Sequence, residues 1–213
     1  MDWMDEPIYQ RHRLAASFLR VVALSVLWCA CTLPVITAGP AAIAAYYAAV
    51  KVIRRGRGKL VPSFFHAFRA GFRAGAPTGL CALALGGLLV FCVRFASLLG
   101  EPGGVWAVLR YVYLLLLILA GCLTMFLFPV HSRFQMGFWA GLRLALYLTF
   151  RHLFTAFTCL LIWYLGLRVS AALPACLLAA PGGCFLLCSL ILEPILKGCT
   201  PTGDGGEDEW YLE

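Results

Sequence analysis

The feature that most constrains this chain is a series of long apolar segments from which charged residues are almost absent. Of its 213 residues, 62% are hydrophobic and 13% are charged, and an ordinary soluble domain has roughly 25% charged residues. The mean hydropathy is +0.87. This composition excludes a soluble globular enzyme, a disordered regulator and a nucleic-acid-binding domain. It predicts an all-α, polytopic membrane protein, because helices satisfy their own backbone hydrogen bonds in lipid.

Six apolar segments are expected to enter the membrane as one helical bundle. They cover approximately residues 17–38, 40–53, 75–99, 105–130, 153–169 and 173–192. The second segment would be only about 21 Å long as a helix, so we expect it to be short or re-entrant in a hydrocarbon core of about 30 Å. Pro34, Gly39 and Pro40 mark the break that precedes it, because proline interrupts a helix and also suits the first turn of a new one.

These segments form a single integral membrane domain, residues 1–199, and an acidic tail at residues 200–213 is expected to be disordered. The basic residues predict how the domain is oriented. If all six segments carry the chain across, 14 of the 17 Lys and Arg residues lie on the side of the two termini. Since cytoplasmic loops are enriched in Lys and Arg, both termini are expected to be cytoplasmic.

Residues 63–73 predict a basic amphipathic helix rather than a span. On a helical projection its four phenylalanines, Phe65 and Phe68 among them, fall on one side, whereas Arg69 and Arg73 fall opposite. Such a helix lies in the membrane interface, either as an anchoring lead-in to the next span or as a docking face for a partner. Residues 131–152 have a similar pattern, which suggests a duplicated unit of amphipathic helix and hairpin, although composition alone could also produce it.

The sequence offers no group that is suited to catalysis. Between Pro7 and Gly203 the only acids are Glu101 and Glu193, and there is no HExxH, Walker or G-x-S-x-G motif. The ten cysteines include no C-x-x-C pair and no Cys/His cluster with zinc spacing. We therefore expect a protein that is not an enzyme, with no catalytic residue, no cofactor, no metal site and no nucleic-acid partner.

Two features are expected to hold the helices together. Glu193, which is followed by Pro194 in the last segment, is the one acid near an arginine-rich side of the membrane, so we expect it to pair and hold the bundle rather than to transfer protons. The glycine pairs Gly86–Gly87 and Gly182–Gly183 are expected to permit close helix packing.

Four blocks of the chain resemble the YesL-like family of bacterial integral membrane proteins, a domain of unknown function. The blocks are Thr32–Pro40 with Tyr46, Tyr47 and Lys51; Ser63–Arg69 with Phe72; Phe128–Pro129 with Arg133 and Phe134; and Leu192–Lys197. The first and last blocks together are fairly specific. The chain departs from the family pattern at Gly71, where a polar residue is common, and in its richness in Ala, Gly and Cys.

The resemblance implies a bacterial cytoplasmic membrane protein that is encoded beside carbohydrate transporters and polysaccharide-degrading enzymes. The implied role is a non-enzymatic accessory component of ABC-type carbohydrate uptake or its regulation, with the lipid bilayer and sugar-transporter subunits as partners. The alternative is a small transporter in its own right, which the broken helices and the apparent duplication would suit.

Overall fold

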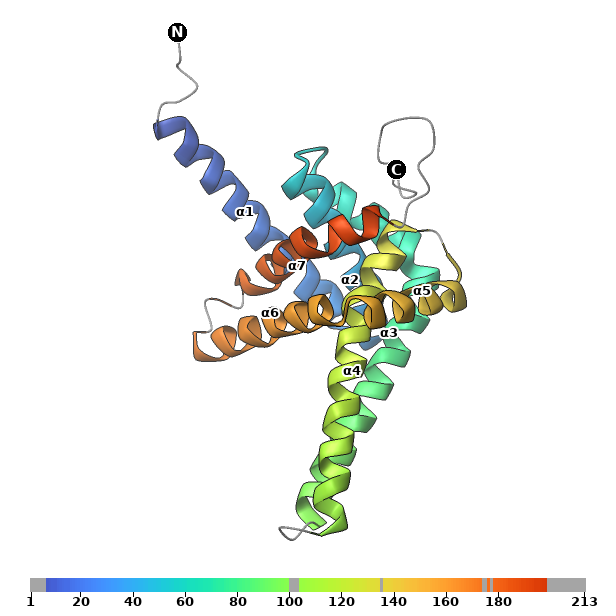
Figure 1. Cartoon of the computed structure of the whole chain (residues 1–213). Helices are drawn as coiled ribbons and strands as arrows, with labels where there is room; N and C mark the ends of the chain where they lie inside the picture. The colour runs from blue at the N-terminus through green and yellow to red at the C-terminus, as the bar shows by residue number, and fades with distance from the viewer. Residues whose placement is uncertain (1–6, 100–103, 135, 174–175, 177, 199–213) are drawn as a thin grey trace.

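The computed structural model describes residues 7–99, 104–134, 136–173, 176 and 178–198, and in these residues it contains helices and no strand. The expected disordered tail at 200–213 lies outside them. Figure 1 shows the helices in chain order. They are α1 (Pro7–Thr32), the 3-10 turn η2 (Val35–Thr37), α2 (Ala38–Ala48), the π-helical turn η3 (Ala49–Arg54), α3 (Leu60–Leu99), α4 (Val105–Arg133), α5 (Phe138–Arg151), α6 (Leu153–Ala172) and α7 (Ala180–Lys197).

Helix α2 lies at the centre of the packed part of the molecule, where it contacts α1, α3, α4 and α7. Every residue from Gly39 to Val50 is buried, and alanine accounts for much of this stretch. Small side chains allow neighbouring backbones to approach closely, which is how membrane helices gain packing contacts where lipid offers no hydrophobic driving force.

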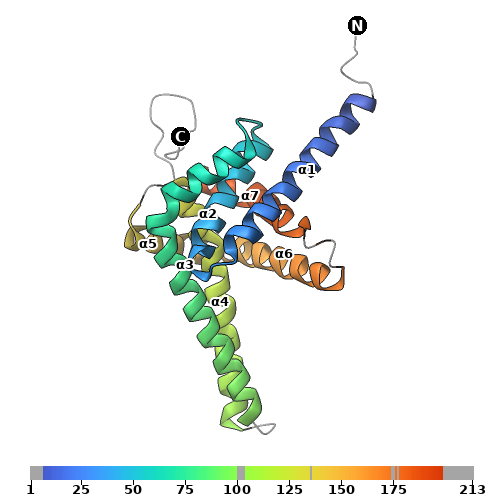
Figure 2. The same cartoon turned by 180° about the vertical axis from the view of Figure 1, so that it is seen from behind.

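Helices α3 and α4 form a hairpin that projects away from this packed part (Figure 1). Helix α3 has 40 residues, or about 60 Å at 1.5 Å per residue. Figure 2 shows that it changes direction between its first and second halves. Pro77 lies inside the helix, and it removes one backbone hydrogen bond and displaces the preceding turn. Helix α6 runs across the direction of the hairpin in both views, so the bundle is not a set of parallel rods.

The second apolar segment is longer than expected. The structure makes Val35–Arg54 a continuous helical segment of 20 residues, about 30 Å long, because the chain turns helical immediately after Pro34. It is one of five segments in the described residues that are long and apolar enough to cross a membrane. The segment that falls short is instead the first: it ends at Thr32 rather than at residue 38, and its apolar part is Ser17–Thr32.

Of the two alternatives for the amphipathic segment at residues 63–73, the structure agrees with a lead-in to the next span. These residues are the first turns of α3 and continue without a break into the span expected at 75–99. The similar segment at 131–152 is divided instead, because α4 runs on to Arg133 and a distinct α5 begins at Phe138. The two segments that suggested a duplication thus differ in how they join their neighbours.

The last span begins and ends later than the range 173–192, since α7 covers Ala180–Lys197. Of its two glycines, Gly182 permits close helix packing as expected and Gly183 does not. A Cβ atom at Gly182 would lie 2.4 Å from the Val21 carbonyl oxygen, whereas nothing lies within 4 Å of one at Gly183. The expectation fails for Gly86 and Gly87, where added Cβ atoms would also meet open space.

Candidate functional site

The most distinctive chemical feature of the structure is a buried ionic cluster that joins three elements. Nη1 of Arg133, the last residue of α4, lies 2.5 Å from Oε1 of Glu193 in α7. Nη2 of Arg55 lies 3.5 Å from the same carboxylate oxygen. We refer to Arg133, Glu193 and Arg55 as the ionic cluster.

The turn after η3 brings the third member of the ionic cluster into place. Gly56 and Gly58 both have positive φ angles, 67° and 80°, which glycine adopts without a steric penalty. They reverse the chain between η3 and α3, so that Arg54 and Arg55 face α7. Nη1 of Arg54 donates a hydrogen bond of 2.8 Å to the Ser189 carbonyl oxygen, one turn before Glu193.

The ionic cluster is largely buried, so separating its charges would cost much free energy. The side chains of Arg133 and Glu193 are 0% and 3% exposed, and that of Arg55 is 24% exposed. Removing one partner of a buried pair leaves an uncompensated charge and costs about 3–5 kcal/mol. With two guanidinium groups for one carboxylate, the ionic cluster carries a net positive charge. It can fix α4, α7 and the η3 turn in one arrangement.

The other residues singled out from the sequence do not gather around this cluster. Gly39 and Pro40 lie in the first turn of α2 and are buried against α3, where a Cβ at Gly39 would lie 2.0 Å from the Gly75 carbonyl oxygen. Pro34 is exposed before η2, and its carbonyl oxygen accepts hydrogen bonds from the Thr37 amide and hydroxyl groups. Pro194 follows Glu193 but is exposed.

The first half of α3 presents both a buried and an exposed face. Phe64 is fully buried and packs in a row of aromatic contacts with Phe65 and Phe68. Phe65 and Phe72 are 42% and 40% exposed, and the i, i+4 and i+7 spacing places them beside Arg69 rather than opposite it. The expected separation of aromatic from basic residues is therefore wrong. We call the exposed face made by Phe65, His66, Arg69, Phe72 and Arg73 the basic–aromatic surface.

Sequence reasoning missed one important packing motif, the glycine stripe of α3. Gly71, Gly75 and Gly79 recur every four residues and are all buried against α2. A Cβ at Gly79 would lie 2.6 Å from the Gly39 Cα atom. The small-xxx-small spacing was visible in the sequence and is a known signal for close helix crossing. Arg133 and Arg55 were also missed as partners of Glu193, and no local pattern marks them.

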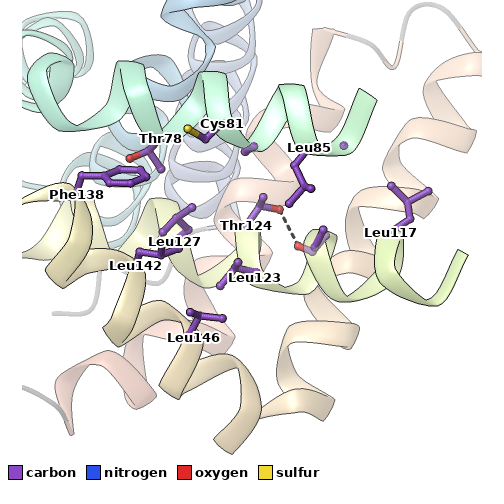
Figure 3. Close-up of a pocket in the computed structure, with 14 residues that line it drawn as sticks. Thr78, Cys81, Leu85, Leu117, Leu123, Thr124, Leu127, Phe138, Leu142 and Leu146 are labelled. Atoms are coloured by element: carbon purple, nitrogen blue, oxygen red, sulfur yellow. Dashed lines mark hydrogen bonds between the residues drawn. The ribbon is translucent and has the colours of Figure 1, made fainter. Parts of the chain in front are cut away.

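A large apolar cavity of about 460 Å³ opens between α3, α4 and α5 (Figure 3). Leu85, Leu127, Phe138 and Leu142 form much of its wall. Its two hydroxyl groups are already engaged, because Thr78 donates to the Ala74 carbonyl oxygen and Thr124 to that of Gly121. This cavity therefore suits an apolar occupant.

The described residues contain no group of three or more His, Cys, Asp or Glu side chains that could hold a metal ion. His131, near the end of α4, is 6% exposed and close to α5. A Cβ at Gly141 would lie 2.4 Å from its Cε1 atom, and its Nδ1 lies 2.9 Å from the Leu127 carbonyl oxygen. This histidine fills the contact between α4 and α5.

Residues 21–92 are similar to a family described as a protein of unknown function, DUF624. The match spans about a third of the chain, from within α1 to within α3, and it includes Arg55 and the glycine stripe but neither Arg133 nor Glu193. No curated protein and no solved structure matches the chain.

Proposed function

We propose that this chain is a non-enzymatic integral membrane protein of the YesL-like type that serves as an accessory component of ABC-type carbohydrate uptake or its regulation. It acts in a bacterial cytoplasmic membrane with both termini in the cytoplasm. Its partners are the lipid bilayer and subunits of a sugar transporter. The apolar helices are compatible with the membrane location, and the resemblance of the four sequence blocks supplies the link to carbohydrate uptake.

The observation that best supports an accessory role is the basic–aromatic surface. The buried face of α3 packs against α2 and holds the first half of α3 in place. Phe65, Arg69 and Phe72 therefore project from a fixed helix. Aromatic and basic side chains of this kind are suited to the headgroup level of a membrane. In our orientation the surface lies at the cytoplasmic boundary, where a transporter subunit would meet it.

The alternative, a transporter in its own right, has less support. The large cavity between α3, α4 and α5 offers only apolar side chains and hydroxyl groups that already donate to their own helix. A sugar leaves water only where protein groups replace its hydrogen bonds. This cavity provides no such groups, so it does not favour the passage of a carbohydrate.

Co-purification in a mild detergent tests the accessory role. We expect the tagged chain, isolated from cells grown on an inducing polysaccharide, to bring down an ABC transporter subunit. The variant Arg69→Glu/Arg73→Glu should lose that partner, and the matched variant Arg94→Glu/Arg110→Glu, which changes two exposed arginines of the projecting hairpin, should keep it. If no transporter subunit is recovered with the unmodified chain, the proposal fails. A flux of sugar into proteoliposomes that contain the purified chain alone would instead establish the transporter.

Cysteine labelling tests the orientation separately. On a background without native cysteines, Arg57→Cys lies in the exposed turn before α3 and Gly104→Cys lies at the far end of the hairpin. We expect a membrane-impermeant maleimide to reach Gly104→Cys in intact cells and Arg57→Cys only after the membrane is opened. Labelling of Arg57→Cys in intact cells would contradict cytoplasmic termini.

A further inference from the structure

The large apolar cavity of Figure 3 is enclosed by one face from each of three helices. Helices α3 and α5 both pack mainly on α4 rather than on each other. On α3, Thr78, Cys81 and Leu85 line the cavity with the i, i+3 and i+7 spacing of one helix face. On α5, Phe138 and Leu142 line it one turn apart. Figure 3 shows Leu85 and Leu142 extending from their helices toward the same space.

The cavity is long and has the volume of one lipid chain. Its lining residues on α4 run from Leu117 to Leu127, about 15 Å along the helix. Figure 3 shows Thr78 and Phe138 at one end and Leu117 at the other. A cavity of about 150 Å³ with an apolar wall holds one benzene molecule. At about 460 Å³, this cavity has room for about 18 carbon atoms on the same scale, as many as one long acyl chain contains.

The wall of the cavity favours an apolar occupant over water. A buried water molecule needs about two to four polar partners. The hydroxyl groups of Thr78 and Thr124 already donate to carbonyl oxygens of their own helices, and the thiol of Cys81 is a weak donor. An empty cavity would deprive its lining atoms of dispersion contacts. An acyl chain would restore these contacts and needs no hydrogen bond.

The cavity is accessible from the outer surface of the hairpin. Leu85 and Leu146, which line it from α3 and α5, are 48% and 38% exposed, and Cys81 is exposed as well. Helices α3 and α4 are long and apolar enough to cross a membrane, and their most apolar stretches are largely exposed. In a membrane, a lipid chain can therefore enter the cavity from the side without leaving the hydrocarbon region.

Two adjacent glycines of α3 distinguish the space inside the cavity from the space outside it. Gly86 lines the cavity, and a Cβ atom added there would have no atom within 4 Å. A Cβ atom at Gly87 would also meet open space, but Gly87 is not among the lining residues. A larger side chain is thus tolerated at both positions, and only the one at Gly86 takes up room in the cavity.

We propose that this cavity binds one acyl chain of a membrane phospholipid, whose charged headgroup stays outside it at the end marked by Thr78. The exposed Arg69 and Arg73 precede Thr78 on α3, so the headgroup lies at the level of the basic–aromatic surface. A free fatty acid has the same kind of chain, but a bilayer supplies phospholipid in far greater amount. The proposal rests on the membrane location proposed above and not on a transporter partner, so lipid binding and co-purification can fail independently.

Photo-crosslinking of the full-length chain in a mild detergent tests the site. After removal of native lipid, the chain is mixed with a phosphatidylglycerol that carries a diazirine near the end of one acyl chain, and peptide mass spectrometry locates the bonds formed on illumination. We expect bonds on the lining stretches of α3, α4 and α5, and saturable competition by unlabelled dioleoylphosphatidylglycerol. A free fatty acid with the same diazirine chain forms the second arm and should label these stretches more weakly.

The variant Gly86→Leu places a side chain where the acyl chain would lie. It should raise the phospholipid concentration needed for half-maximal labelling about tenfold, because the leucine and the chain cannot share the space. The matched control Gly87→Leu makes the same change one residue later, outside the cavity, and should bind as the unmodified chain does. Should Gly86→Leu fail to fold, Ala82→Phe fills the same cavity, and Ala84→Phe at an exposed position outside its wall is its control.

Three outcomes would overturn the proposal. The first is labelling that unlabelled phospholipid does not compete away, which would mean that lipid only coats the hairpin. The second is unchanged affinity in folded Gly86→Leu or Ala82→Phe, which would place the chain outside the cavity. The third is saturable labelling by the fatty acid and not by the phospholipid, which would mean that the occupant does not come from the bilayer's phospholipid.

Discussion

The segment Val35–Arg54 and the α3–α4 hairpin are all apolar enough to cross a membrane, yet they meet different surroundings. Within the most apolar stretch of each helix, 72% of residues are buried in Val35–Arg54, compared with 11% in α3 and 17% in α4. Alanine is the commonest residue of the buried segment, around Ile43, Tyr46 and Tyr47, whereas the hairpin is rich in leucine and phenylalanine that remain exposed.

This difference shows that hydrophobicity alone does not identify the core of such a protein. Lipid is as apolar as leucine, so large apolar side chains can face outward without a penalty. The helix that faces other helices needs small residues for close approach and polar groups that have partners. We therefore expect substitutions in and around α2 to change the stability of the fold, and equivalent substitutions on the hairpin to have little effect.

The largest effect is expected from the ionic cluster. Arg133→Met leaves Glu193 buried with only the partly exposed Arg55 as a partner, and it should lower the free energy of unfolding by about 3–5 kcal/mol. The control is Arg110→Met on the exposed end of the hairpin, which should change it by less than about 0.5 kcal/mol. Unfolding of the purified chain by SDS in mixed micelles measures both values.

The double variant Arg133→Met/Glu193→Met distinguishes pairing from simple crowding. Because it removes both buried charges, it should recover most of the stability that the single variant loses. Glu193→Met alone completes the comparison. If the double variant loses as much stability as Arg133→Met and Glu193→Met together, Arg133 and Glu193 act independently and the ionic cluster does not hold the bundle.

A smaller loss is expected at the crossing of α2 and α3. Gly39→Ala places a Cβ atom 2.0 Å from the Gly75 carbonyl oxygen, so the two backbones must separate, at a cost of about 3 kcal/mol. Gly87 lies in α3 as well, but a Cβ atom added there would have no atom within 4 Å. Gly87→Ala should therefore leave the stability unchanged or raise it by up to about 1 kcal/mol. Equal Tm values for the two variants in detergent would show that the close crossing does not form.

The sequence was sufficient to predict an all-helical protein with helices long and apolar enough to cross a membrane, and a break at Pro34, because both depend on local properties. Gly39 and Pro40, which were expected to lie in the same break, are helical. Hydropathy could not place the start of α3 at Leu60. The basic residues between Ser63 and Arg73 lower the mean hydropathy there, although the helix continues through them into an apolar span. The pairing of Arg133 with Glu193 joins residues 60 positions apart and depends on how α4 and α7 pack. Helical periodicity contains no information about that packing.

A third pair of substitutions compares buried and exposed apolar side chains directly. Ile43→Ala truncates a fully buried side chain in α2, and Leu115→Ala truncates one that is 58% exposed on α4. The first should cost about 2 kcal/mol because it leaves a cavity in a packed interior. The second should cost a few tenths, since lipid fills the space. SDS unfolding gives both values, and a Leu115→Ala loss as large as that of Ile43→Ala would mean that another protein surface covers the hairpin.

The smallest effect is expected where the two regions meet, at the basic–aromatic surface of α3. Each basic residue near an anionic membrane surface contributes about 1 kcal/mol. Arg69→Glu/Arg73→Glu should therefore loosen the first turns of α3 more than Arg69→Gln/Arg73→Gln does, because the membrane repels glutamate but not glutamine. The loosening stays local, since Phe64 and Ala67 keep the opposite face of these turns buried.

Chymotrypsin cleavage at Phe65 and Phe72 in inverted vesicles measures this loosening, and it does not depend on the arginines as cleavage sites. Cleavage should be slow in the unmodified chain, faster in the glutamine variant and fastest in the glutamate variant. Equal rates in all three would mean that this surface does not contact lipid headgroups and that packing against α2 alone holds it.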